Sequence, residues 1–428
     1  MYAVILVLSL LSVVVADKHV LIVAPRDAWI DYGVQSETCR MYKDIIAGGV
    51  KPENIILMST HNVPDMEENP FPGNLYTDDS PDAPGKDYAH GCIEFIDYEA
   101  EFMTGDVFLA ILRGDTDKLK ELTGMENPRA LKSTEEDELM LYFSSHGGPG
   151  RVVVGETRVS DTELLDTIKY MHEQKMYKHF FIMMEACYSG SMFTHLPKDL
   201  NVFAMTAAND EYSSYESHCP PHDDVDGKHI GACLSCYWDN SIQWFIEGNS
   251  GVTLNAVHHH AYDDVCHAGA VQFPSEYGDI EGIGSMKIRD FMGEIPAGNG
   301  HKKVDENDVP IAKADVPTHL AKWRAIRASK EESARALAAY EKRVHLEAKR
   351  EVEVMRLGAA ILNERVANKA LHTAAKVFSP SCVSELAEAL VVKCGHTYPM
   401  KETTVNMLKN ICLPGFNAVD LDFSEICL

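Results

Sequence analysis

Short apolar runs separated by polar, helix-capable segments fill the chain up to about residue 292. The runs are HVLIVA (19–24), NIILM (54–58), VFLAIL (107–112), ELMLYFSS (138–145), HFFIMMEA (179–186) and VFAMTAA (202–208). Continuous apolar runs of this length, joined by helices, are typical of strands in a parallel sheet that is covered on both faces. The sequence therefore predicts an α/β domain with a mostly parallel sheet.

A different pattern follows this domain. Residues 293–317 are rich in Gly, Pro and Asp, which predicts a linker or processing segment. From residue 318 the pattern is helical, and apolar residues three or four positions apart predict one face of a long helix. These residues are Leu337, Tyr340, Val344, Ala348, Val352, Met355 and Ala359. We expect an all-α C-terminal domain over residues 318–428.

The amino-terminal segment has the pattern of a secretory signal peptide. An apolar run from Ala3 to Val15 ends in small residues before Asp17 and is too short to span a membrane. We expect residues 1–16 to be removed and a peptidase domain to occupy residues 17–292. No later stretch of 18 or more apolar residues exists, so no stable membrane span is expected. The secretory pathway, leading to a lysosome, a vacuole or the outside of the cell, is the expected location.

Charge differs between the two regions. The chain carries a formal net charge of −26, whereas residues 317–428 hold 16 Lys and Arg against 13 Asp and Glu. A strongly acidic body repels phosphate, so nucleic-acid binding is disfavoured. The basic tail is expected to bind carboxylates of the acidic body and to loosen as acidification protonates them.

Cys187 and His146 are the candidate catalytic pair. Each follows an apolar run, and each alone would be typical of a buried structural residue. Parallel strands bring their carboxyl ends to one edge of a sheet, where the two side chains would meet. An imidazole beside a thiol can make it a thiolate and later protonate the leaving amine. The backbone N–H groups of Gly147 and Cys187 would then bind the developing oxyanion. Eleven cysteines fit an oxidising compartment, and Cys187 is the expected free thiol.

The motifs together resemble one family. HVLIVA, LRGD, YFSSHGG, KMYKHFFIMMEACYSGSM, HLPKDLNVFAMTAAN and SSY are similar to legumain, a clan CD cysteine peptidase of family C13. The resemblance implies a caspase-like catalytic domain and a C-terminal domain that keeps the enzyme latent until it is removed. It also implies disulfides Cys382–Cys412 and Cys394–Cys427. No cofactor or metal is implied, and the implied partners are protein or peptide substrates, the chain's own tail as an inhibitor, and cystatin-type inhibitors as candidates.

The chain departs from the family at its specificity pocket. Where the family has Asn-Tyr-Arg-His after the first strand, this chain has Asp31, Tyr32, Gly33 and Val34, and Asp31 would orient His146 and favour its imidazolium form. The implied pocket residues are Glu185, Ser213, Ser214, Gly33, Val34 and Ala232. Of the family's charged pocket groups only Glu185 is retained, so the strict preference for Asn is expected to be lost.

Two alternatives to an active legumain-like peptidase remain at this point. One is a binding or decoy protein that retains the catalytic pair but whose pocket no longer accepts substrate. The other is a subunit like that of glycosylphosphatidylinositol transamidase. Separately, the CLSC motif at Cys233 and Cys236 has a spacing that suits zinc, but a secreted chain more commonly uses such cysteines for disulfides.

Overall fold

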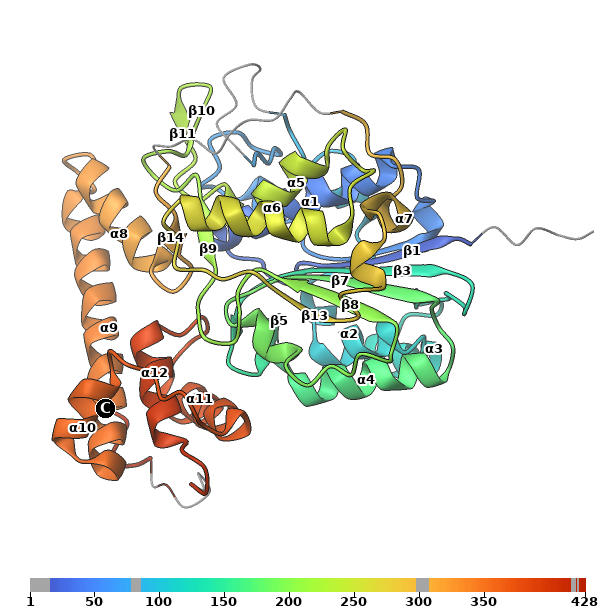
Figure 1. Ribbon diagram of the computed structural model, residues 1–428. Helices are drawn as coiled ribbons and strands as arrows, with labels where there is room; N and C mark the ends of the chain where they lie inside the picture. Colours follow the sequence, from blue (N-terminus) through green and yellow to red (C-terminus); the bar gives the residue numbers. More distant parts are fainter. Residues whose placement is uncertain (1–15, 78–85, 298–307, 417–420, 422) are drawn as a thin grey trace, which may run out of the picture.

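The computed structural model describes residues 16–77, 86–297, 308–416, 421 and 423–428. Residues 1–15 of the predicted signal peptide lie outside the described residues. Figure 1 shows an α/β domain with a separate group of helices, formed by the C-terminal part of the chain, packed beside it. Across the described residues, no helix has both the length and the apolar character that crossing a membrane requires.

A six-stranded sheet forms the centre of the α/β domain. Its strand order is β13-β8-β7-β3-β1-β2, and every neighbouring pair is parallel except β13 with β8. The strands are β1 (Lys18–Val23), β2 (Ile55–Met58), β3 (Glu138–Ser144), β7 (His179–Glu185), β8 (Val202–Thr206) and β13 (Ser275–Gly278). The predicted α/β class with a mostly parallel sheet is confirmed.

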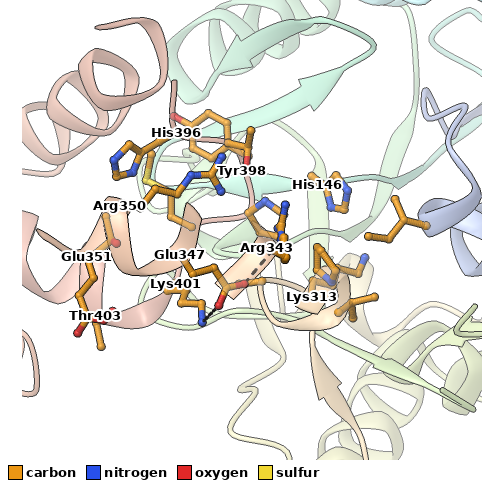
Figure 2. A pocket seen from close by; sticks show the side chains of 18 of the residues that line it. His146, Lys313, Arg343, Glu347, Arg350, Glu351, His396, Tyr398, Lys401 and Thr403 are labelled. Carbon is orange, nitrogen blue, oxygen red and sulfur yellow. Dashed lines mark hydrogen bonds and ion pairs between the residues drawn. The ribbon is translucent and has the colours of Figure 1, made fainter. Parts of the chain in front are cut away.

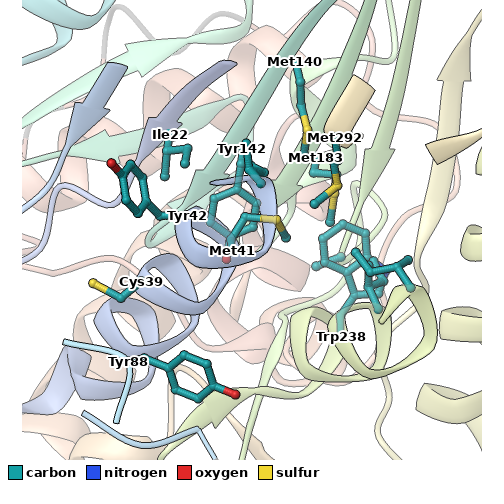
Figure 3. Close-up of a cluster of buried hydrophobic side chains, with 14 of the residues drawn as sticks. Ile22, Cys39, Met41, Tyr42, Tyr88, Met140, Tyr142, Met183, Trp238 and Met292 are labelled. Carbon is teal, nitrogen blue, oxygen red and sulfur yellow. The ribbon is translucent and has the colours of Figure 1, made fainter. Parts of the chain in front are cut away.

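Helices cover both faces of this sheet (Figure 1). Alternate residues of a strand point to opposite faces, so Val20 and Ile22 of β1 join one apolar core while Leu21 and Val23 join the other. The first core, part of which Figure 3 shows, is covered by α1 (Tyr32–Ala47), α5 (Tyr237–Ile246), α6 (Leu254–His267) and α7 (Ile288–Met292). The second is covered by α2 (Gly105–Leu112), α3 (Thr116–Thr123) and α4 (Asp161–Glu173). Burial on both faces explains why the strands are continuously apolar.

One predicted strand is a helix. The run VFLAIL at 107–112 lies in α2, which begins after Thr104, whose side-chain oxygen accepts a hydrogen bond from the Val107 N–H. Such a cap satisfies a backbone donor that the first helical turn leaves without a partner. A short apolar run fits a buried strand and a buried helix equally well, so its periodicity did not separate the two.

Three small sheets extend from the main one. They are formed by β4 (Gly147–Gly148), β5 (Arg151–Val154) and β6 (Thr157–Ser160); by β9 (Tyr215–Ser217), β12 (Ser235–Cys236) and β14 (Ile311–Ala312); and by β10 (Asp224–Val225) and β11 (Lys228–His229). β14 comes from the segment predicted to be a linker. Its processing role stays a prediction.

The C-terminal helices are α8 (Val316–Arg327), α9 (Ser333–Leu362), α10 (Glu364–Ala370), α11 (Pro380–Cys394) and α12 (Glu402–Ile411). The predicted long helix corresponds to α9, but its predicted apolar face is wrong. Leu337, Val344 and Val352 are 42–48% exposed, whereas Val354 and Leu357 are buried. α8 lies beside the part of α9 that reaches beyond α10, α11 and α12 (Figure 1), and only the carboxyl-terminal part of α9 packs into the apolar cluster that those three helices form. Disulfides Cys382–Cys412 and Cys394–Cys427 tie α11 to α12 and to the end of the chain.

Candidate active site

Cys187 lies two residues beyond β7 and is completely buried. Its sulfur lies 2.9 Å from Oγ of Ser213 and accepts from the backbone N–H of Ser214 at 3.4 Å. Burial raises the pKa of the thiol, and the opposing effects of Lys313 and Ser213 do not cancel it. In the closed structure Cys187 is therefore a thiol rather than a thiolate.

His146 lies two residues beyond β3, at the same edge of the sheet. Its Nε2 lies 2.8 Å from Oδ1 of Asp31, and Oδ2 of Asp31 accepts from Nε of Arg26 at 3.1 Å. Of the described groups, none is a hydrogen-bond partner for Nδ1 of His146. Asp31 therefore fixes the ring through one nitrogen and leaves the other for proton transfer.

The pKa shifts of Asp31 and His146 differ from the expectation that Asp31 favours the imidazolium form of His146. Burial opposes ionisation of Asp31, but the charges of His146 and Arg26 hold the pKa of its carboxyl below the ordinary value. For His146 burial has the larger effect, and the pKa of the imidazole is lowered despite Asp31. The expected imidazolium is thus not favoured while the tail covers the site.

Cys187 and His146 converge on one edge but do not contact each other through a hydrogen bond of the described residues. Gly147, the other predicted oxyanion residue, lies directly against the backbone of Cys187. His146 faces a cavity of about 470 Å³ that is also lined by Lys313, Ala314 and Tyr398 (Figure 2). The cavity separates the histidine from the C-terminal helices.

A segment of the chain itself lies along this edge. β14 pairs antiparallel with β9, Ile311 opposite Glu216 and Ala312 opposite Tyr215. The next residue, Lys313, donates its backbone N–H to the carbonyl of Ser214 at 3.0 Å. Ser214 is the residue whose own N–H bonds the Cys187 sulfur, so the extended segment runs directly past the Cys187 thiol.

The side chain of Lys313 is fully buried in the pocket that contains Glu185. Its Nζ lies 2.9 Å from Oε1 of Glu185 and 3.8 Å from Oε1 of Glu216. It also donates to the carbonyl of Ser145 at 3.5 Å. The cation is therefore held by two carboxylates and a backbone oxygen, with no access to solvent.

The other predicted pocket residues have different surroundings. Gly33 lies against Glu216, because a Cβ at Gly33 would come within 3.0 Å of the Glu216 Oε2 atom and of the Ser235 backbone nitrogen. Val34 packs with Ala24 and Cys236. Ala232 lies in the apolar core between the sheet and α1, not beside Lys313. The structure thus brings Glu185 and Gly33 to the pocket and leaves Ala232 out.

Sequence reasoning missed Glu216, Lys313 and Arg26. Glu216 follows the SSY motif directly and could have been noted as a third acid near Glu185. Lys313 carried no local signal, since its role depends on partners about 100 residues earlier in the chain.

The C-terminal helices cover Cys187, the candidate nucleophile. Cys187 and Tyr188 belong to the same apolar cluster as tail residues such as Leu386 and Leu408. The Tyr398 ring lies against the backbone at Gly148, where a Cβ would come within 2.1 Å of the ring. The closed structure therefore leaves no direct path from solvent to the Cys187 sulfur.

The ion pairs between the body and the tail have the opposite polarity to the expected one, in which basic tail residues would bind carboxylates of the body. Where both partners are described, the ion pairs between residues 17–292 and 318–428 join Arg151 and Arg158 of the body to Glu388 of the tail. The basic tail residues Arg343 and Lys349 instead pair within α9. In these ion pairs the tail thus supplies the acid, although the buried tail residue Lys409 also donates to the backbone carbonyl of Asp210 in the body at 3.4 Å.

Cysteines of the catalytic domain form two further disulfides, Cys39–Cys92 and Cys219–Cys233. In the CLSC motif only Cys233 is bridged, whereas Cys236 is a buried free thiol and Cys266 an exposed one. The expectation that disulfides use this motif therefore holds for one of its two cysteines. Cys187 is free, as expected, but it shares that state with these two residues.

Comparison with known proteins places the chain in a family. The Peptidase C13 family profile matches residues 18–294. Legumain of Mus musculus is 34% identical over 279 residues, which are 64% of this chain and 59% of the mouse protein, so the match spans less than two thirds of that relative. Legumain of Homo sapiens is 29% identical over 432 residues, covering 96% of this chain and 93% of the human protein. The chain belongs to the peptidase C13 family.

A solved structure of caspase-1 from Spodoptera frugiperda is also similar, with 9% identity and a TM-score of 0.34, covering 61% of this chain and 88% of that one. Because that TM-score is low, the fold is described from this chain's own strand order and helices. The resemblance to legumain is confirmed, and the comparisons favour neither the decoy nor the transamidase-like alternative.

Proposed function

We propose that this chain is a legumain-like cysteine endopeptidase made as a latent precursor. The observation that carries the proposal is the extended segment at residues 311–313, which pairs with β9 and passes the Cys187 sulfur as a peptide substrate would. Antiparallel addition of a strand is a common way to hold a peptide.

The residues present suit acyl transfer. The Cys187 thiol gives its proton to an imidazole nitrogen of His146, and the sulfur attacks the carbonyl carbon of the peptide bond. The N–H groups of Cys187 and Gly147 receive the oxyanion. The C–N bond then breaks as His146 protonates the leaving amine, and water hydrolyses the thioester to restore the thiol.

Latency follows from the covered site. The tail buries Cys187, and burial raises the thiol's pKa while lowering that of His146, so transfer of the thiol proton to the imidazole is disfavoured in the covered site. Removal of residues 318–428 after cleavage near the 293–317 segment would release the enzyme. An acidic lysosomal or vacuolar compartment, or the extracellular space, is the proposed location, and cystatin-type proteins are proposed inhibitors.

The test measures cleavage of an unfolded, alkylated protein at pH 4 to 7. Wild type, Cys187→Ala and Cys266→Ala are compared as full-length chains and after proteolytic removal of the tail. We expect Cys266→Ala to match wild type, because Cys266 is exposed and away from the site. Loss of the nucleophile should lower the rate at least about 1000-fold. Cleavage by Cys187→Ala at the wild-type rate would refute the proposal.

A further inference from the structure

The pocket that holds Lys313 differs from one built for a neutral amide. Its walls present the carboxylates of Glu185 and Glu216 and the carbonyl of Ser145, all of which are acceptors and none of which is a donor when the acids are ionised. An amide side chain needs both donors and acceptors, whereas an ammonium or guanidinium group needs acceptors only. The pocket therefore matches a cation.

The position of Lys313 matches that of the residue before a cleaved bond. The segment is in register with β9 up to Ala312, and the Lys313 N–H continues that pairing by bonding Ser214. Because the Ser214 N–H also bonds the Cys187 sulfur, Ser214 links Lys313 to Cys187, and Lys313 is the residue of the segment that is aligned with the thiol. Ala314 follows on the side of His146, in the same cavity.

Space for the second carboxylate comes from Gly33. A side chain there would collide with Glu216 Oε2 and with the backbone of Ser235. Glu216 itself begins the pairing with β14, so its side chain is set by the strand that also aligns the peptide. Gly33 thus leaves room for Glu216 beside Glu185. Because burial raises the pKa of Glu216 to about 8, its negative charge joins the pocket only as pH rises toward and past that value.

Deeper acids do not add charge to this pocket. Burial raises the pKa of Glu37 and of Asp239 well above their ordinary values, reinforced by the charge of Asp239 at Glu37 and by the charge of Glu185 at Asp239. The hydroxyl of Tyr142 hydrogen-bonds Asp239 at 2.6 Å. The carboxylates that contact the bound cation are therefore Glu185 and Glu216.

We propose that the pocket selects Lys or Arg on the amino side of the cleaved bond, that Glu185 and Glu216 read this charge, and that Lys313 is an internal occupant of the same pocket. This inference rests on the proposed function and names its substrate class. It departs from the expectation of a relaxed preference among Asn, Asp and Gln.

The first experiment tests the internal occupant without any need for catalysis. Full-length wild type, Lys313→Met, Lys313→Arg and the exposed control Lys330→Met are treated with iodoacetamide, and alkylation of Cys187 is followed by mass spectrometry. Methionine leaves Glu185 buried without its cation, so the segment should leave the pocket and alkylation should speed up at least about 10-fold. Lys313→Arg and Lys330→Met should stay near the wild-type rate. An unchanged rate in Lys313→Met would overturn the role of Lys313 as the occupant.

The second experiment tests substrate choice. The peptide Val-Pro-Ile-Ala-Xaa-Ala-Asp-Val is offered to tail-freed enzyme made from wild type, Glu216→Gln and Cys187→Ala, with Lys, Arg, norleucine, Asn or Asp at Xaa. Norleucine has the apolar stem of lysine without its charge. We expect kcat/KM for Lys or Arg to exceed that for norleucine about 100-fold, because an unpaired buried carboxylate is costly. Glu216→Gln should narrow this ratio at least about 5-fold above about pH 8, where Glu216 is ionised, mainly through KM, and should change it little at about pH 6.

The outcomes separate the two proposals. Cleavage that depends on Cys187 but prefers Asn, or shows no preference for charge, would overturn this inference and leave the peptidase intact. If no peptide is cleaved although iodoacetamide alkylates Cys187 rapidly in the tail-freed enzyme, the proposed function fails and the inference fails with it.

Discussion

The Nε2 atom of His146 lies 2.8 Å from Oδ1 of Asp31, at the position where the family resemblance implies an asparagine. An anion beside an imidazole favours its protonated form, so Asp31 raises the pKa of His146 against the lowering effect of burial. The pair therefore fixes the ring and also sets the pH at which it can accept a proton.

We predict that Asp31→Asn keeps activity within about 10-fold, whereas Asp31→Ala loses about 100-fold or more, because only the first can still hold the ring. Without the carboxylate charge the pKa of His146 falls further, so the acid limb of the pH profile of kcat/KM should shift to lower pH in Asp31→Asn. The profiles are measured with tail-freed enzymes. An unchanged acid limb in Asp31→Asn would show that Asp31 only positions the ring.

The close contact between Gly148 and Tyr398 gives a second prediction. A methyl group at Gly148 has no room beside the Tyr398 ring, so Gly148→Ala should displace the tail from the loop that follows His146. We expect faster deuterium uptake in α11 and α12 and faster alkylation of Cys187 in the full-length variant. Gly251→Ala is the matched control, since a Cβ there meets nothing within 4 Å. Equal uptake in Gly148→Ala and Gly251→Ala would show that the contact between Gly148 and Tyr398 does not hold the tail against the catalytic domain.

The central strands, and the meeting of the candidate catalytic pair at one edge of the sheet, could be predicted from the sequence, because both depend on local pattern. β1, β3, β7 and β8 are apolar runs buried on both faces, and Cys187 and His146 follow two of them. β13 could not be found in this way. It is an edge strand of sequence SEYG, mostly only half-buried, and lacks an apolar run.

The pocket shows the limit of such reasoning more clearly. Lys313 pairs with Glu185 and Glu216, both far away in sequence, and nothing in the residues around Lys313 indicates burial. The mapping of Ala232 to the pocket relied on counting from a family motif, and the backbone there turns its side chain into the core instead. Side-chain burial at such positions depends on tertiary contacts that periodicity does not contain.

The tail disulfides support a third prediction. Cys382–Cys412 joins α11 to the end of α12, and α11 supplies Glu388 for the ion pairs with the body. Replacing both cysteines by alanine should cost the tail about 2–5 kcal/mol, because the unfolded tail gains freedom. Deuterium exchange in α11 and α12 of the full-length chain should speed up accordingly. Cys266→Ala is the control, and equal exchange in the double variant and the control would contradict the prediction.

The last prediction concerns pH and stability. Burial, reinforced by the charges of Glu185 and Asp31 although opposed by Lys313, raises the pKa of Glu216 to about 8, and burial raises that of Asp44 to about 7. Between the ordinary carboxyl pKa and these values, the folded chain holds protons that the unfolded chain releases. The free energy of unfolding should therefore fall as pH rises from 5 to 8, by at most about 1.4 kcal/mol per pH unit for each group. This is the opposite of a latch that loosens in acid.

Chemical denaturation of the full-length Cys187→Ala chain at pH 5, 6, 7 and 8 measures this slope without self-cleavage. Adding Glu216→Gln, which stays neutral at every pH, should flatten the slope up to pH 8, while adding Asp44→Asn should flatten it only up to about pH 7. Glu163→Gln, at an exposed helix cap, is the control and should leave the slope unchanged. If the free energy of unfolding rises from pH 5 to 8 instead, the prediction is wrong. Protonation of other carboxylates would then destabilise the folded chain in acid by more than protonation of Glu216 and Asp44 stabilises it, and acid would open the tail-covered form directly.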